Sequence, residues 1–106
     1  MTIWLITGCS SGFGFELALL ALHNGSKVIA TSRNPSKTPE LVAQVESLGG
    51  KWITLDVTSS SAPKIVQDAV QIWGGIDVLV NNAGYAMIGA LEDVRRVSMM
   101  YEEEYG

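Results

Sequence analysis

The chain has 106 residues, of which 47% are hydrophobic and 17% are charged, and its formal net charge is −4. This length suits one domain, and the composition is that of a folded globular protein, not of a disordered chain. The acidic balance argues against a nucleic-acid partner. No apolar run approaches the ~18 residues that a membrane helix requires. We therefore expect a cytoplasmic protein with no membrane span.

Short apolar runs alternate with helical patterns along the chain. Buried parallel strands are expected over residues 3–7, 27–31, 51–56 and 76–80. Helices are expected between them, over residues 13–24, 39–48 and 62–73. The apolar stripe expected on the first helix consists of Phe13, Leu17, Leu20 and Ala21. The alternation predicts an α/β fold with a parallel sheet and right-handed crossovers.

The crossovers predict a Rossmann-type doubly wound sheet with strand order 3-2-1-4, partial because it ends after the fourth strand. In such a sheet, ligands bind where the strand order reverses, at the carboxyl ends of the first and fourth strands. Two polar, glycine-containing turns follow these two strands, at residues 8–14 and 81–84. We expect these turns to converge although they are far apart in the sequence.

The first of these turns has the spacing Gly8-x3-Gly12-x-Gly14, between a strand and a helix. Gly8 allows the tight turn, Gly12 allows the backbone to approach a pyrophosphate, and Gly14 allows close packing of the helix on the sheet. The alternative is a tight strand-to-helix connection that binds nothing. Cys9 lies in this turn, either as a small filler or as a thiol activated by the helix N-terminus.

Together, the glycine turn, the pair Asp56-Val57 and the run Asn81-Asn82-Ala83-Gly84 resemble the short-chain dehydrogenase/reductase family over residues 2–94. The resemblance implies a dinucleotide cofactor and gives a role to each motif. It implies that the pyrophosphate and ribose are lined by Ser10, Ser11, Gly12, Phe13 and Gly14, that Asp56 and Val57 flank the adenine, and that Asn82, Ala83 and Gly84 lie by the nicotinamide ribose. It also implies that Asn81 ties the sheet together. For Asp56, a helix cap or a loop carboxylate is the alternative.

The end of the second strand decides between the two nicotinamide cofactors. NAD(H) sites place an acid there for the ribose 2′-OH, whereas NADP(H) sites place a cation there for the 2′-phosphate. Here Ser32 and Arg33 end the strand, Lys37 is near, and residues 25–39 contain no acid. Arg33 can bind a phosphate in bidentate fashion, so NADP(H) is preferred over NAD(H). A solvated loop arginine is the alternative.

The resemblance also implies hydride transfer between the nicotinamide and a carbonyl or alcohol carbon. A tyrosine, a lysine four residues later and a serine assist that reaction in the family. The last lysine here is Lys64, so no tyrosine after Gly84 has such a partner. We expect the cofactor-binding half of an NADP(H)-dependent oxidoreductase, inactive by itself, with a small-molecule substrate only in a longer chain. The alternative is a non-catalytic NADP(H)-binding module or an inactive fragment.

The last residues differ in character from the rest. Residues 1–94 are expected to form the nucleotide-binding portion, and residues 95–106 a divergent acidic tail. Val94, Val97 and Tyr101 form one weak helical stripe, but Glu102, Glu103 and Glu104 follow at the unfavourable end of such a helix. We therefore expect a frayed helix or disorder. The fourth strand would then be an open apolar edge, through which the chain could self-associate.

Overall fold

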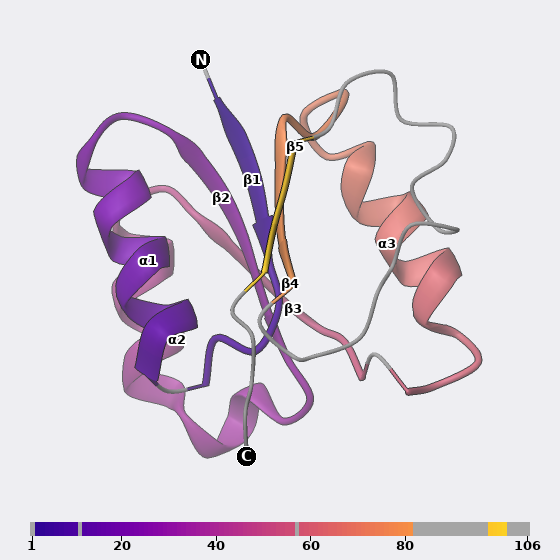
Figure 1. The fold of residues 1–106 in the computed structure, drawn as a ribbon. Helices are drawn as coiled ribbons and strands as arrows, with labels where there is room; N and C mark the ends of the chain where they lie inside the picture. The colour runs from indigo at the N-terminus through magenta and orange to yellow at the C-terminus, as the bar shows by residue number, and fades with distance from the viewer. Residues whose placement is uncertain (1, 11, 57, 82–97, 102–106) are drawn as a thin grey trace.

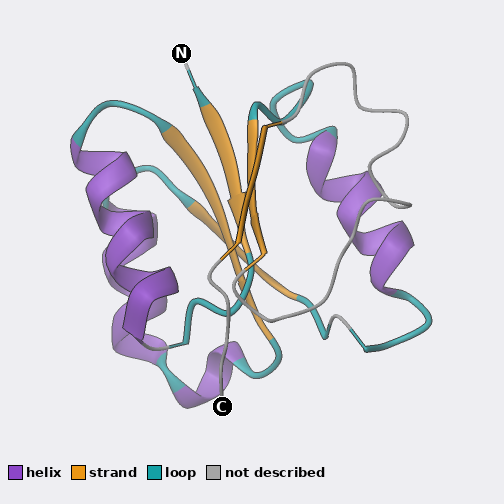
Figure 2. Ribbon diagram, viewed as in Figure 1, coloured by secondary structure: helices purple, strands orange, loops and turns teal. Residues whose placement is uncertain are grey.

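A computed structural model describes residues 2–10, 12–56, 58–81 and 98–101. Within these residues the elements are β1 (Ile3–Ile6), α1 (Gly12–His23), β2 (Lys27–Ser32), the 3₁₀ turn η1 (Pro35–Lys37), α2 (Pro39–Ser47), β3 (Lys51–Thr54), α3 (Ala62–Val70), β4 (Val78–Asn81) and β5 (Ser98–Tyr101). Figure 1 shows α1 and α2 on one face of the sheet and α3 on the other. The strands form the central layer between them (Figure 2). The predicted α/β alternation is confirmed.

The sheet has the order β3-β2-β1-β4-β5, and every neighbouring pair in it is parallel. Leu5 at the centre of β1 pairs with Ile29 of β2 and with Leu79 of β4. The predicted order 3-2-1-4 is therefore confirmed, and the reversal of strand order lies between β1 and β4. The carboxyl ends of these two strands border the position at which doubly wound sheets bind ligands.

β5 corrects the expectation for residues 98–101 of the tail, while residues 95–97 and 102–106 lie outside the described residues. Residues 98–101 form a strand, not a helix or a disordered segment, and Ser98 to Tyr101 pair with Val78 to Asn81. The sheet therefore continues past its fourth strand, and β4 is not an open edge. The physical reason is that the edge of β4 presents a row of unpaired main-chain N–H and C=O groups. Hydrogen bonds to these groups stabilise a short apolar segment more than one weak helical stripe does. Self-association through the β4 edge loses its basis.

Two apolar cores lie on the two faces of the sheet. The core under α3 is formed by Leu5, Ile29, Leu55, Ala62, Val66, Ala69, Val70, Ile76 and Leu79. The core under α1 and α2 is formed by Ile6, Cys9, Ala18, Ala21, Leu22, Val28, Ala30, Val45, Trp52 and Val80. Successive residues of β1 and β2 alternate between the two cores, because side chains of a strand point to opposite faces. Burial on both faces explains why these strands read as continuous apolar runs.

The stripe predicted for α1 is wrong in part. The residues that α1 buries are Gly14, Ala18, Ala21 and Leu22, whereas Phe13 is 44% and Leu20 is 59% exposed. Apolar residues occur on every side of α1, so their spacing could not identify the face that packs. Small residues at positions 14, 18 and 21 decide it, because they let the helix approach the sheet closely.

None of the helices that the described residues form is long and apolar enough to cross a membrane.

Gly50 is required by space and not by backbone conformation. A Cβ placed on it would lie 2.7 Å from Val45 Cγ1, 3.1 Å from the Val45 carbonyl oxygen and 3.3 Å from Leu22 Cδ1. We expect Gly50→Ala to lower the free energy of unfolding by about 1–3 kcal/mol, the usual cost of overpacking a core. Urea titration followed by circular dichroism measures it.

The control is Val45→Ala, alone and combined with Gly50→Ala. Val45 Cγ1 is the atom nearest to the added Cβ. The loss of stability in the double variant should therefore be smaller than the sum of the losses in the two single variants. Strict additivity would contradict the steric account.

Candidate functional site

The turn between β1 and α1 is fixed by bonds to both neighbouring strands. The Thr7 amide donates to the Val80 carbonyl at 3.0 Å, and the Cys9 amide donates to the Thr31 carbonyl at 2.9 Å. The φ angles of Gly8 and Gly12 are 68° and 59°, in the region that favours glycine. These main-chain bonds thus anchor the turn at the carboxyl ends of β1, β2 and β4.

Gly12 is the first residue of α1, so the positive end of the helix dipole lies in this turn. A Cβ on Gly12 would meet no heavy atom within 4 Å. The space beside this backbone is therefore accessible, and the glycine is required there for its positive φ. A helix N-terminus with accessible backbone is suited to bind a phosphate.

Cys9 is a filler of this turn. It is fully buried, and its Sγ donates to the Ile6 carbonyl at 3.2 Å. Burial raises the pKa of the Cys9 thiol to about 12, and the Thr31 backbone lowers it by less. The thiol is consequently neutral and is not activated by the helix N-terminus.

Asn81, the last residue of β4, is fully buried beside Thr7. The Thr7 hydroxyl lies 3.4 Å from both Asn81 Oδ1 and the Val80 carbonyl. This contact ties the end of β4 to the end of β1, as expected for Asn81. Its Nδ2 atom is buried and has no hydrogen-bond partner within the described residues. Asn81 therefore holds the ends of β1 and β4 together.

Arg33 and Asp56 follow β2 and β3, on the adenine side of the expected site. Thr58 donates to Asp56 Oδ1 from its hydroxyl at 2.6 Å and from its amide at 2.9 Å. These two bonds hold the pKa of the Asp56 carboxyl below its usual value, and the charge of Arg33 contributes in the same direction. Asp56 is therefore a loop carboxylate anchored by Thr58 and within reach of the charge of Arg33. Both interpretations of Asp56, as a loop carboxylate and as an adenine contact, are compatible with this geometry.

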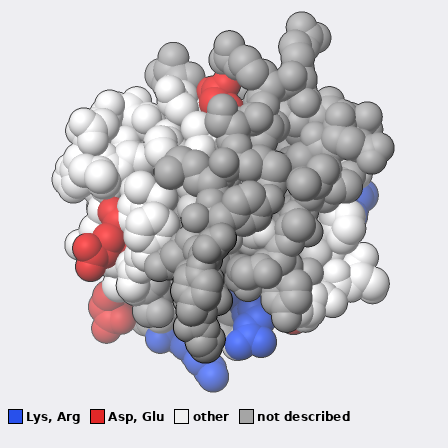
Figure 3. Space-filling view, in the orientation of Figure 1, with Lys and Arg blue, Asp and Glu red and all other residues white. Residues whose placement is uncertain are grey.

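Two exposed cations, Arg33 and Lys37, lie near the carboxyl ends of the strands, whereas Lys27 and Lys51 begin β2 and β3 and Lys64 lies in α3. In Figure 3, Lys and Arg side chains lie along the lower edge, the edge at which the strands of Figure 1 end. Arg33 directly follows β2, Lys37 ends the 3₁₀ turn η1, and both side chains are exposed. Exposed cations near the carboxyl ends of the strands suit an anionic ligand.

The topology places the described candidate residues at one edge of the sheet. They are Gly8, Ser10, Gly12, Phe13 and Gly14 on the first turn and helix, Ser32 and Arg33 at the end of β2, and Asp56 after β3. Gly14 is buried, as close packing of the helix requires. The other predicted residues, Ser11, Val57, Asn82, Ala83 and Gly84, lie outside the described residues.

Two partners near the site were not predicted. The indole of Trp52 donates to Ser32 Oγ at 3.0 Å, and Thr58 binds Asp56. The Asp-x-Thr spacing could have indicated the second contact, because Asp side chains often bind the backbone two residues on. No local pattern indicates the first, since residues 32 and 52 meet only through the pairing of β2 with β3.

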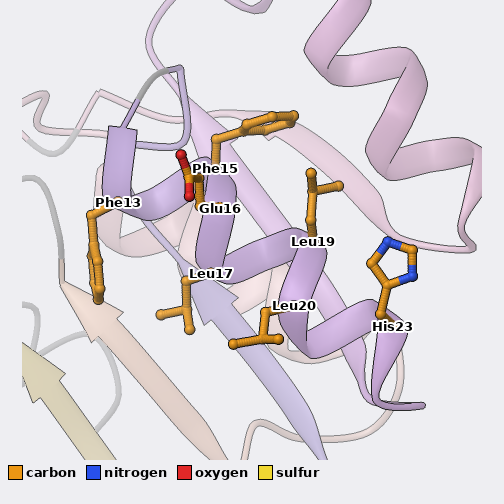
Figure 4. A pocket seen from close by; sticks show the side chains of 7 residues that line it. All are labelled: Phe13, Phe15, Glu16, Leu17, Leu19, Leu20 and His23. Atoms are coloured by element: carbon orange, nitrogen blue, oxygen red, sulfur yellow. The ribbon is translucent and has the colours of Figure 1, made fainter.

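A shallow apolar hollow runs along the outside of α1 and shares Phe13 with the candidate site. Its lining consists of Phe13, Phe15, Glu16, Leu17, Leu19, Leu20 and His23. In Figure 4, Phe13, Leu17 and Leu20 point from one flank of the helix, while Phe15 and Leu19 point from the other. These side chains therefore lie on two flanks of the same helix. The residues that the structure describes do not contain three His, Cys, Asp or Glu side chains grouped for a metal ion.

The pKa of Cys9 gives a direct test of its burial. The folded chain keeps the thiol proton up to about pH 12, whereas an exposed thiol loses it near 9.0. This contribution to stability is fully present below pH 9 and declines as the pH rises toward 12. We expect Ellman's reagent at pH 8 to leave the native thiol unmodified and to modify it rapidly in urea. Rapid stoichiometric reaction of the native chain would contradict the burial.

Comparison with known proteins supports the fold and shows the family. The chain is 41% identical to the oxidoreductase claN of Passalora fulva over 102 residues, which are 95% of this chain and 46% of that protein. Two solved structures, each 31% identical, cover 79% of the chain: an NAD⁺-bound xylitol dehydrogenase, with TM-score 0.70, and an actinorhodin polyketide ketoreductase with NADPH, with TM-score 0.69. The chain spans 34% of the first and 33% of the second.

It therefore spans less than half of the length of these relatives. The pattern of the family described as short chain dehydrogenase matches residues 2–102, which is nearly the whole chain and includes every motif discussed above. The chain belongs to the short-chain dehydrogenase family.

Proposed function

We propose that the chain is the cofactor-binding portion of an NADP(H)-dependent short-chain oxidoreductase. The observation that carries this proposal is the position of two features at one edge of the sheet. Helix α1 begins at Gly12, after the end of β1, and the backbone at Gly12 is accessible to a ligand. Arg33 is an exposed cation at the end of the adjacent strand β2. The first suits a pyrophosphate, and the second suits a further phosphate on the adenosine ribose.

The described residues fit a dinucleotide. The backbone of Gly8, Ser10 and Gly12 would hold the pyrophosphate, because these residues form the turn at the start of α1. Asp56 would lie beside the adenine, and the buried Asn81 would hold the ends of β1 and β4 together beside the nicotinamide end. When bound, the nicotinamide supplies or accepts the hydride. This chain's residues bind and orient that cofactor.

The preference for NADP(H) rests on charge. Arg33 is exposed, and residues 25–39 contain no acid that would repel a 2′-phosphate or bind a 2′-OH. The nearby carboxylate of Asp56 is already bonded twice to Thr58. Since the two structural relatives carry NADPH and NAD⁺ respectively, family membership leaves the choice open, and the residues after β2 must decide it.

We expect Arg33→Asp to reverse the cofactor preference. The wild-type chain should bind NADPH more tightly than NADH, by roughly tenfold or more, because a charge-assisted bond to phosphate contributes about 1.5–3 kcal/mol. The variant should bind NADH more tightly, because a carboxylate repels the phosphate and accepts from the ribose hydroxyl. Fluorescence titration measures both dissociation constants. Lys64→Asp, an exposed charge change on α3, is the matched control, and equal affinities in the wild-type chain would remove Arg33 from its role.

A second candidate function is a non-catalytic NADP(H)-binding module or an inactive fragment. Within these 106 residues no lysine follows Lys64, so they contain no Tyr-x3-Lys pair after Gly84. We propose that a carbonyl or alcohol substrate is used only by a longer chain.

Activity and binding separate these functions. Incubation of the pure chain with NADPH and a panel of ketones and aldehydes should give no oxidation of the cofactor above the protein-free rate. Turnover would contradict the inactivity of these 106 residues. Binding without turnover would support a cofactor-binding unit, whereas no binding at all would identify a fragment without this function.

A further inference from the structure

Ser32 links β2 to β3 through both its side chain and its main chain. Its Oγ accepts from the Trp52 indole Nε1 at 3.0 Å, and its carbonyl accepts from the Leu55 amide at 2.8 Å. Ser32 is 3% exposed and Trp52 is 9% exposed, so the side-chain bond is shielded from water. A buried hydrogen bond is costly to break, because the group left behind stays unpaired.

The two bonds lie at the bases of the two loops that border the adenine side of the proposed site. Ser32 directly precedes Arg33, and Leu55 directly precedes Asp56. Arg33 is near enough to Asp56 for its charge to act on that carboxyl. Ser32 and Trp52 therefore connect the strand end that carries the cation to the strand end that carries the carboxylate.

We propose that Trp52 is a positioning residue that, through Ser32, holds Arg33 where it can bind a phosphate on the adenosine ribose. This proposal rests on the proposed function and adds a residue to its site. Trp52 does not touch the cofactor, because it is buried in the core under α2 with Ala30 and Val45. Trp52 fixes Ser32, the residue directly before Arg33. Discrimination between NADPH and NADH then depends on a side chain of the core.

An indole suits this role for a chemical reason. Its N–H is only a donor, so the bond to Ser32 has one direction. The serine hydroxyl must accept from Trp52, and its own hydrogen is directed away from the indole. The side chain of Ser32 is thereby held in one orientation, and the backbone at the end of β2 is held by the Leu55 amide. Less of the binding free energy is then lost in ordering Arg33.

The test is Trp52→Phe, which keeps an aromatic ring in the core and removes the N–H donor. We expect the dissociation constant for NADPH to rise about threefold to tenfold, the range that one hydrogen bond provides. The dissociation constant for NADH should change by less than about twofold, because NADH has no phosphate for Arg33. Loss of stability alone would weaken both cofactors equally, so the ratio of the two constants is the informative quantity.

Trp4→Phe is the matched control. Its Nε1 is also buried but has no hydrogen-bond partner in the described part of the chain, so the cofactor ratio should not change. Ser32→Ala removes the same bond from the other side and should change the ratio as Trp52→Phe does. If Trp52→Phe does not fold, Ser32→Ala carries the test. The double variant should be no worse than either single one, because both act through one bond.

The outcomes separate this proposal from the one on which it rests. A wild-type chain that binds NADPH and NADH equally, or neither of them, contradicts the proposed cofactor preference and the role of Trp52 with it. If the wild-type chain prefers NADPH and both Trp52→Phe and Ser32→Ala keep that ratio, the preference stands and the role of Trp52 is overturned.

Discussion

The insertion of β1 between β2 and β4 is the constraint on which the rest of the structure depends. Main-chain bonds at its end, from Thr7 to Val80 and from Cys9 to Thr31, keep three strand ends side by side. The turn that follows must then leave the sheet sharply, and Gly8 and Gly12 supply the positive φ angles that this requires. Because α1 begins there, its N-terminus faces the same edge as the polar ends of the neighbouring strands. The position of the candidate site is a consequence of that topology.

Much of this could be predicted from the sequence, because the relevant signals are local. Glycines and prolines mark the ends of the elements, and the alternation of short apolar runs with helical patterns fixes a parallel sheet. The handedness of the crossovers then gives the order 3-2-1-4, which brings residues 8–14 and 81 to one edge. The excess of positive charge over residues 25–39, which contain Arg33 and Lys37 but no acid, can be read from the sequence alone.

The features that could not be predicted depend on contacts between distant residues. The buried face of α1 is chosen by Gly14, Ala18 and Ala21, which fit against the sheet, while a helix that is apolar on all sides gives no periodic signal. β5 forms because β4 offers a partner, which overrides a weak helical preference. The bond from Trp52 to Ser32 exists only because β2 and β3 pair in one register. Tertiary pairing decides each of these.

The measurement that tests the central claim most directly is a map of backbone amide chemical shifts during titration with NADPH. The account predicts that the largest changes occur at the carboxyl edge of the sheet, in Gly8, Ser10, Gly12 and Arg33. Lys27 and Asp77, which lie at the opposite ends of the strands, should not change. Changes at that opposite edge or along the outer face of α1, or no changes at all, would contradict a dinucleotide site at the end of β1.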